Sequence, residues 1–115
     1  MRVEGAQSQI AGLGAVTVDN GVAGIRLLNG AQANIDGQGG SVVAHGSAHG
    51  ILLDAGASAL TAANATITAD GSGNGIENAA EIGAVSLRGL TVQAGNGAGI
   101  RTATVFDPAS TVTVN

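Results

Sequence analysis

The chain has 115 residues, of which 20 are glycine and one is phenylalanine, and it has no tyrosine, tryptophan, cysteine or lysine. Its net charge is −4 and only 10% of its residues are charged, which argues against a nucleic-acid partner, because such a partner requires a basic face. No apolar run approaches the roughly 18 residues of a membrane-spanning helix, and residues 1–6 lack the apolar core of a signal peptide.

Short segments with period-two alternation, separated by glycine, predict β-strands along the whole chain. They recur three to a repeat, so that each repeat contributes one strand to each of three walls. In chain order the expected strands are Ala15–Asn20, Gly24–Leu28, Ala33–Asp36, Ser41–His45, Gly50–Asp54, Ala59–Ala62, Ala65–Asp70, Gly75–Asn78, Ala84–Arg88, Leu90–Ala94 and Thr111–Val114.

A Gly-Ile pair opens each repeat, at positions 24, 50, 75 and 99. A nearly constant period of this length is typical of a stacked solenoid. Three short strands per turn predict an all-β fold, a right-handed parallel β-helix of about four to five coils, because parallel crossovers are strongly biased to that hand. Residues 1–115 then form a single module. It begins and ends in the middle of a repeat, which is the pattern expected of a fragment of a longer protein.

The alignment of the repeats predicts inward columns of aliphatic side chains, with each layer roughly 4.8 Å above the last. The expected columns are Ile25, Ile51, Ile76 and Ile100; Leu27, Leu53, Asn78 and Thr102; Ile35, Leu60 and Val85; Val42, Ile67 and Val92; and Ala44, Ala69 and Ala94. Asparagine at a corner can adopt a left-handed conformation, and Asn74 and Asn96 are candidates for it.

Asp19, His45 and Asp70 fall in one outward column of the alignment. A histidine between two carboxylates could form a small metal or anion site, or a contact that responds to pH near neutrality. The simpler interpretation is three polar residues at a corner. Metal sites usually need three or four convergent ligands, and His49 belongs to the next corner, so we expect neither a metal nor a cofactor.

Glu77 and Arg101 occupy the same offset in successive repeats, which predicts an ion pair on the outer face. Catalysis is the alternative, because β-helical polysaccharide lyases combine clustered acids with a basic residue. The acids of this chain are spread over different faces, and no column places two of them beside an arginine. We therefore expect no catalytic residues and no enzyme. The acids are Glu4, Asp19, Asp36, Asp54, Asp70, Glu77, Glu81 and Asp107.

Ser41, Thr66 and Thr91 form a hydroxyl column, and regular threonine columns on a flat face can bind ice. The neighbouring column of Val43, Thr68 and Gln93 is irregular, and threonine is in any case a favourable strand residue. The glycine-rich segments are not followed by a helix and so do not predict a phosphate-binding loop.

The form Gly-Ile-x-Leu-x-x-Gly-Ala, followed by an alternating strand and Ala-Thr-Ile-Thr-Ala-Asp-Gly, is clearest over Gly50–Gly75. It resembles the β-helical passenger domains of bacterial autotransporters, the pertactin-like family, over roughly residues 8–115. The resemblance implies a fragment of a longer passenger domain, exported through the outer membrane and displayed at the bacterial cell surface or secreted. It also implies a role in adhesion or host interaction.

Passenger function usually depends on loops inserted between strands, and the sequence predicts no loop longer than a corner. We therefore expect a structural stem or adhesion segment. The alternative is a carbohydrate-active, pectate-lyase-like enzyme or a sugar-binding module, which the single aromatic residue, Phe106, disfavours. The expected partners are neighbouring coils, or a second copy stacked end to end through Thr111–Val114. A host surface or extracellular matrix is a further candidate, whereas nucleic acid and direct membrane insertion are not expected.

Overall fold

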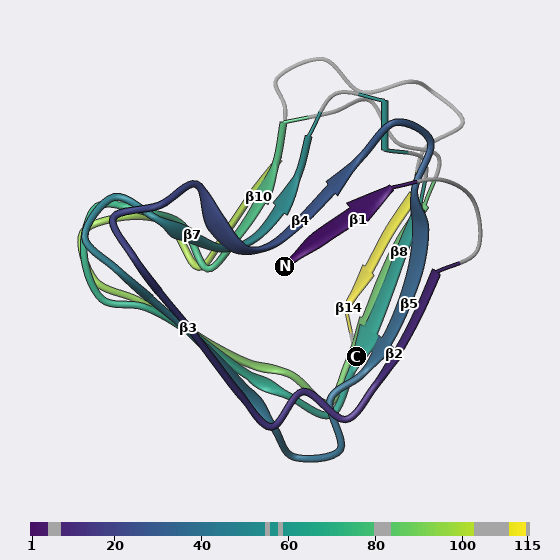
Figure 1. Cartoon of the computed structure of the whole chain (residues 1–115), viewed down its shortest axis with the longest axis horizontal. Coiled ribbons are helices and arrows are strands. Elements are labelled where there is room, and N and C mark those ends of the chain that lie inside the picture. Colours follow the sequence, from purple (N-terminus) through teal and green to yellow (C-terminus); the bar gives the residue numbers. More distant parts are fainter. Residues whose placement is uncertain (5–7, 55, 58, 80–83, 103–110, 115) are drawn as a thin grey trace.

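A computed structural model describes residues 1–4, 8–54, 56–57, 59–79, 84–102 and 111–114 of the chain. These residues form strands and turns without a helix, and the strands pair in parallel. Three sheets form the walls of a coil with a roughly triangular outline (Figure 1). The chain runs clockwise from its purple N-terminal end as it recedes from the viewer (Figure 1), which is the right-handed sense. The expected all-β parallel solenoid is confirmed.

Each wall takes one strand from each coil, so that strands close in space are about one repeat apart in sequence. We name the walls sheets A, B and C. Sheet A is β1 (Arg2–Glu4), β4 (Ala23–Leu28), β7 (His49–Leu53), β10 (Ile76–Asn78) and β13 (Ile100–Thr102). Sheet B is β2 (Ser8–Ala11), β5 (Gln32–Asp36), β8 (Ala59–Ala63), β11 (Ala84–Arg88) and β14 (Thr111–Val114). Sheet C is β3 (Ala15–Asp19), β6 (Ser41–His45), β9 (Thr66–Ala69) and β12 (Thr91–Ala94). Each strand expected from the sequence has both ends within one residue of these bounds.

The isoleucine column of sheet A is present as expected. Ile51 pairs in register with Ile25 on one side and with Ile76 on the other, and Ile76 pairs with Ile100. The first three are almost completely buried, whereas Ile100, in the last strand of the sheet, is 39% exposed. In sheet A, identical aliphatic side chains are therefore packed on one another, and the column is least protected at Ile100.

The expected column in sheet B was wrong by two residues. Leu60 pairs with Ala33 and not with Ile35, and Ile35 pairs with Ala62. The expected neighbour on the other side is correct, because Leu60 does pair with Val85. A shift of two residues keeps the same side chains facing inward, so Ile35 and Leu60 are both buried.

The shift originates in the corner between β5 and β6, at Gly37–Gly40. This corner is two residues longer than the one that joins β8 to β9. Its backbone closes a turn in which the Gly40 N–H donates to the Gly37 carbonyl at 2.8 Å. Gln38 and Gly39 both have positive φ, 50° and 81°, which glycine adopts without strain and which is uncommon for glutamine.

Left-handed asparagines do mark corners, but not those expected. Asn20, Asn29 and Asn64 have φ of 51°, 54° and 56°, whereas Asn74 and Asn96 are not left-handed. Asparagine tolerates this region better than most residues because its short polar side chain can bond locally.

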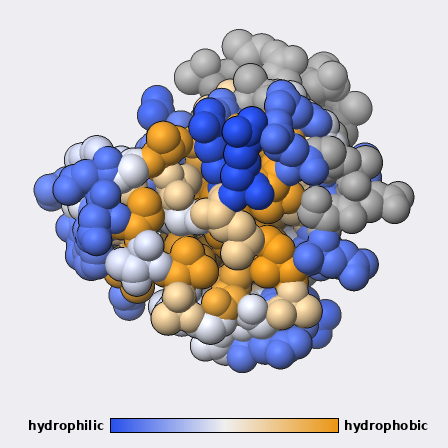
Figure 2. Space-filling view, in the orientation of Figure 1, coloured by the Kyte–Doolittle hydropathy of each residue, from blue (hydrophilic) through white to orange (hydrophobic). Residues whose placement is uncertain are grey.

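The first described residues of the chain, 1–4, are part of the coil. They continue sheet A as β1, whose Val3 pairs with Leu27 and is buried. At the other end of the chain, β14 pairs with β11 and forms one edge of sheet B. Apolar side chains gather at the centre of the face seen in Figure 2, with polar residues around them.

Candidate functional site

The structure brings together the polar column expected from the sequence, at the end of sheet C. Asp19 pairs in register with His45, and the Asp70 N–H donates to the carbonyl of Ala44, so the three side chains lie on successive coils. His45 Nδ1 lies 2.5 Å from Asp70 Oδ2, and its Nε2 lies 4.0 Å from Asp19 Oδ1. The side chains are 40–76% exposed. The arrangement is a surface ladder that links three coils through one imidazole.

This ladder does not have the geometry of a metal centre. Within the described part of the chain, no group of three or more histidine, aspartate or glutamate side chains converges as metal ligands would. His49 belongs to a different cluster, where its Nδ1 accepts a hydrogen bond of 2.9 Å from the backbone N–H of Asn74.

Asn74 is the centre of that second cluster, along one end of sheet A. It is 7% exposed. Its Oδ1 accepts a 2.7 Å hydrogen bond from the Ala98 N–H, and its Nδ2 donates a 2.5 Å hydrogen bond to Glu77. Asn74 therefore joins its own coil to the coil on each side, since it also binds His49. This explains its burial and its role at a corner without a left-handed backbone.

Glu77 and Arg101 pair in register on the outer side of sheet A, as expected. The distance from Arg101 Nη1 to Glu77 Oε1 is 3.7 Å. The Glu77 side chain is only 13% exposed, whereas that of Arg101 is 64% exposed. The carboxylate is therefore fixed by Asn74 and by the ion pair together, and it contributes to the joint between coils.

A stronger ion pair was missed from the sequence. The Arg26 guanidinium donates from both Nε and Nη2 to one oxygen of Asp54, and the two side chains are 38% and 29% exposed. The residues are 28 positions apart, so the guanidinium reaches diagonally past its in-register partner, Leu52. The two charges occupy different offsets in successive repeats, so the alignment of the repeats does not pair them.

At the N-terminal edge of sheet A, Glu4 accepts hydrogen bonds from Asn29 Nδ2 and, at 3.0 Å, from Arg2 Nη2. The bond from Asn29 and then the bond from Arg2 hold the pKa of the Glu4 carboxyl below its ordinary value. Both donors stabilise the charged carboxylate.

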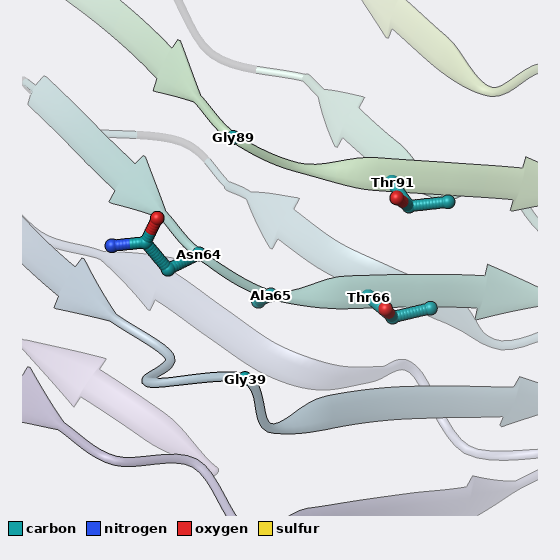
Figure 3. A pocket seen from close by; sticks show the side chains of 6 residues that line it. All are labelled: Gly39, Asn64, Ala65, Thr66, Gly89 and Thr91. Carbon is teal, nitrogen blue, oxygen red and sulfur yellow. The ribbon is translucent and has the colours of Figure 1, made fainter.

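The hydroxyl column of Ser41, Thr66 and Thr91 is in register on sheet C. Beside it, at the corner between sheets B and C, lies an open hollow of about 230 Å³. Figure 3 shows Thr66 and Thr91 lying parallel on successive coils, with Asn64 at the other side of the corner. The hollow is lined by Gly39, Asn64, Ala65, Thr66, Gly89 and Thr91. The hydroxyl column was expected, but the hollow was not, because it depends on the longer corner that carries Gly39.

No described helix has the length and apolar character needed to cross a membrane. No protein-family model, curated protein or solved structure matches this chain.

Proposed function

We propose that this chain is a structural stem, a stack of coils whose role is to extend and support a longer surface-displayed protein. The observation that carries the proposal is that polar side chains form contacts from one coil to the next. His45 binds Asp70, Arg26 binds Asp54, and Asn74 binds Ala98. Each of these contacts joins one coil to another. The charged groups of His45, Asp70, Arg26 and Asp54 are thus engaged in contacts between coils.

The parallel registry supports the same role. In a solenoid each coil contacts only its neighbours, so stability is approximately a sum of coils and interfaces. Such an architecture can be lengthened without redesign. In the full-length protein the partners of this segment are further coils, or a second copy stacked end to end, and a host surface or extracellular matrix contacts the assembled protein.

The placement of this stem in a bacterial autotransporter passenger, exported to the cell surface, is part of the proposal. It depends on the repeat motif of Gly50–Gly75 and its similarity to the pertactin-like pattern. A terminal membrane barrel encoded in the same reading frame would support this placement, and its absence from the complete gene would contradict it.

Duplication of one coil tests the stem role directly. Residues 50–74 are repeated in tandem, so that the new copy joins Asn74 to a second Gly50. We expect a cooperatively folded chain whose maximum dimension along the stack, measured by small-angle X-ray scattering, grows by roughly one strand spacing of 4.8 Å. The matched control inserts the same 25 residues in scrambled order at the same place. A duplicated chain that unfolds like the control would contradict a freely extendable stem.

Incubation with a panel of acidic and neutral polysaccharides tests the alternative, a carbohydrate-active or sugar-binding module. A stem neither depolymerises nor retains these polymers. Turnover of any of them, or saturable binding lost on Thr66→Ala or Thr91→Ala, would replace the stem proposal by the carbohydrate one.

A further inference from the structure

One asparagine in the chain, Asn64, is followed two positions later by a serine or threonine, in the tripeptide Asn64-Ala65-Thr66. Asparagine followed by any residue except proline and then by serine or threonine is the acceptor motif for N-glycosylation. Motifs of this length occur by chance, so the structural setting of the tripeptide decides its meaning.

The tripeptide forms the corner between sheets B and C. It begins directly after β8 and its threonine opens β9. Asn64 and Thr66 are both exposed, whereas Ala65 between them is buried. The two residues that a transferase must recognise therefore face solvent, and the middle residue anchors the corner to the core.

Asn64 is flanked along the stack by glycines. The Gly37 N–H donates to the carbonyl of Ala63, and the Asn64 N–H donates to the carbonyl of Arg88. This ladder places Gly37 on one side of Asn64 and Gly89 on the other. Neither has a side chain. The hollow of about 230 Å³ is lined by Asn64 and Gly89, with Gly39 of the longer corner (Figure 3). A group attached to the amide of Asn64 consequently has room on the surface without displacing a neighbouring coil.

The amide of Asn64 is also held in a defined orientation. Its Nδ2 donates a hydrogen bond of 3.2 Å to Asp36 Oδ1, and the same carboxylate oxygen accepts from the Gln38 N–H at 3.1 Å. A primary amide has two N–H bonds. One of them satisfies Asp36, and the other can be replaced by a bond to carbon without loss of that contact. By contrast, the buried amide of Asn74 is engaged at both its oxygen and its nitrogen.

We propose that the folded corner presents Asn64 as an acceptor of an N-linked glycan. Nδ2 forms a bond to the anomeric carbon of an activated sugar, the bond from that carbon to a phosphate leaving group breaks, and the amide proton passes to a base of the transferase. The donor is a sugar phosphate ester, either nucleotide-linked or lipid-linked. The proposal concerns a modification of the chain and does not depend on its role as a stem.

The test presents the purified chain, folded and urea-unfolded, to two N-linking transferases that recognise this tripeptide. One is a soluble enzyme supplied with a nucleotide-activated hexose, and the other is a membrane oligosaccharyltransferase supplied with a lipid-linked oligosaccharide. A synthetic peptide of residues 61–68 verifies that each enzyme is active. Intact mass and peptide mapping report the product. We expect the folded chain to gain a single glycan at Asn64 with at least one donor, which also identifies the donor class.

Variants make the assignment specific. Asn64→Gln and Thr66→Ala should abolish the mass increase, and Thr66→Ser should retain it. Asn64→Gly provides a second null variant that keeps the left-handed backbone, in case glutamine disturbs the corner. Asn34→Gln, at another exposed asparagine of sheet B, should leave the modification unchanged. Modification of only the unfolded chain, modification of neither form while the peptide reacts, or a glycan that persists in Asn64→Gly would overturn the proposal.

Discussion

The Arg26 guanidinium binds Asp54 Oδ2 with two N–H groups, at 2.9 Å from Nε and 2.5 Å from Nη2. The pair bridges β4 to the residue that follows β7, and both side chains are partly exposed. Loss of Arg26 therefore removes both hydrogen bonds and leaves the half-buried carboxylate of Asp54 without this partner.

Removal of this ion pair should destabilise the chain measurably. We expect Arg26→Gln and Asp54→Asn each to lower the free energy of unfolding by about 0.5–1 kcal/mol, the upper part of the range for partly exposed pairs. A double-mutant cycle from urea unfolding measures the coupling. Fully additive losses would mean that the two side chains do not interact in solution.

The glycines that open the repeats should differ sharply in their tolerance of a methyl group. A Cβ at Gly50 would lie 2.5 Å from the Gly75 carbonyl oxygen and closer still to Ile67 Cγ2, whereas the nearest such atom to a Cβ at Gly99 is Val92 Cγ1 at 3.9 Å. Gly50→Ala should therefore cost about 1–3 kcal/mol or more through overpacking.

Gly99→Ala is the matched control for that substitution. It should be neutral or stabilise the chain by a few tenths of a kcal/mol, since alanine reduces the freedom of the unfolded chain. Thermal unfolding followed by circular dichroism compares the two variants. Equal melting temperatures would show that the coils are spaced differently from the structure.

The same contrast between middle and end applies to the isoleucine column. Ile76 is 1% exposed and Ile100 is 39% exposed. Truncation of Ile76 to alanine should cost about 2–5 kcal/mol, and truncation of Ile100 well below that. Ile76→Asp should be more severe, because it buries a charge without a partner. If Ile76→Ala and Ile100→Ala unfold at the same urea concentration, Ile76 does not face the core.

The stability of the N-terminal strand should depend on pH through the Glu4 carboxyl. Its pKa is lowered by Asn29 and Arg2, so the stabilisation it provides is present above the ordinary carboxyl pKa. That stabilisation is lost as pH falls through the lowered pKa of the folded state. We expect Asn29→Ala to raise the pKa of Glu4 towards its ordinary value in an NMR titration. Asn34→Ala, at an asparagine outside this cluster, should leave it unchanged.

End-to-end association between copies is expected from the exposed side chain and the edge strand near the C-terminal end of the described chain. Ile100 is the exposed member of its column, and β14 is an edge strand of sheet B, which is a template for pairing. Sedimentation over a concentration series should show growth of larger species. Ile100→Lys should weaken this growth, and Ser72→Lys, a charge added at an exposed corner, should not. A chain that stays monomeric at every concentration would contradict stacking between copies.

The sequence was sufficient to predict the coil, but not the pairing register of every sheet. The Gly-Ile pairs place sheet A correctly because glycine and isoleucine recur at equivalent positions. Sheet B was misaligned because a two-residue slip of Ile35 against Leu60 preserves the alternation of inward and outward residues. Only the length of the turn at Gly37–Gly40 distinguishes the two registers. Its residues add nothing to the alternating pattern of apolar side chains from which the register was predicted.

The candidate sites show the same limit: residues at equal offsets in the repeats could be placed together from the sequence, and other contacts could not. Asp19, His45 and Asp70 could be placed together because they sit at equal offsets in successive repeats. The contact of Arg26 with Asp54 could not, because long side chains reach across columns. The hollow beside Asn64 could not be anticipated either, since it depends on the unequal lengths of two adjacent corners.

The parallel pairing of the three sheets has a mechanical consequence. Interstrand hydrogen bonds lie in the direction that separates neighbouring strands, so in this coil they run along the stack. Tension applied evenly to the two ends loads the bonds of all three walls together at each step between coils. Tension applied to one terminus from the side loads a single strand and peels it away. The same segment should therefore resist tension along the stack more strongly than tension that peels strands from one end.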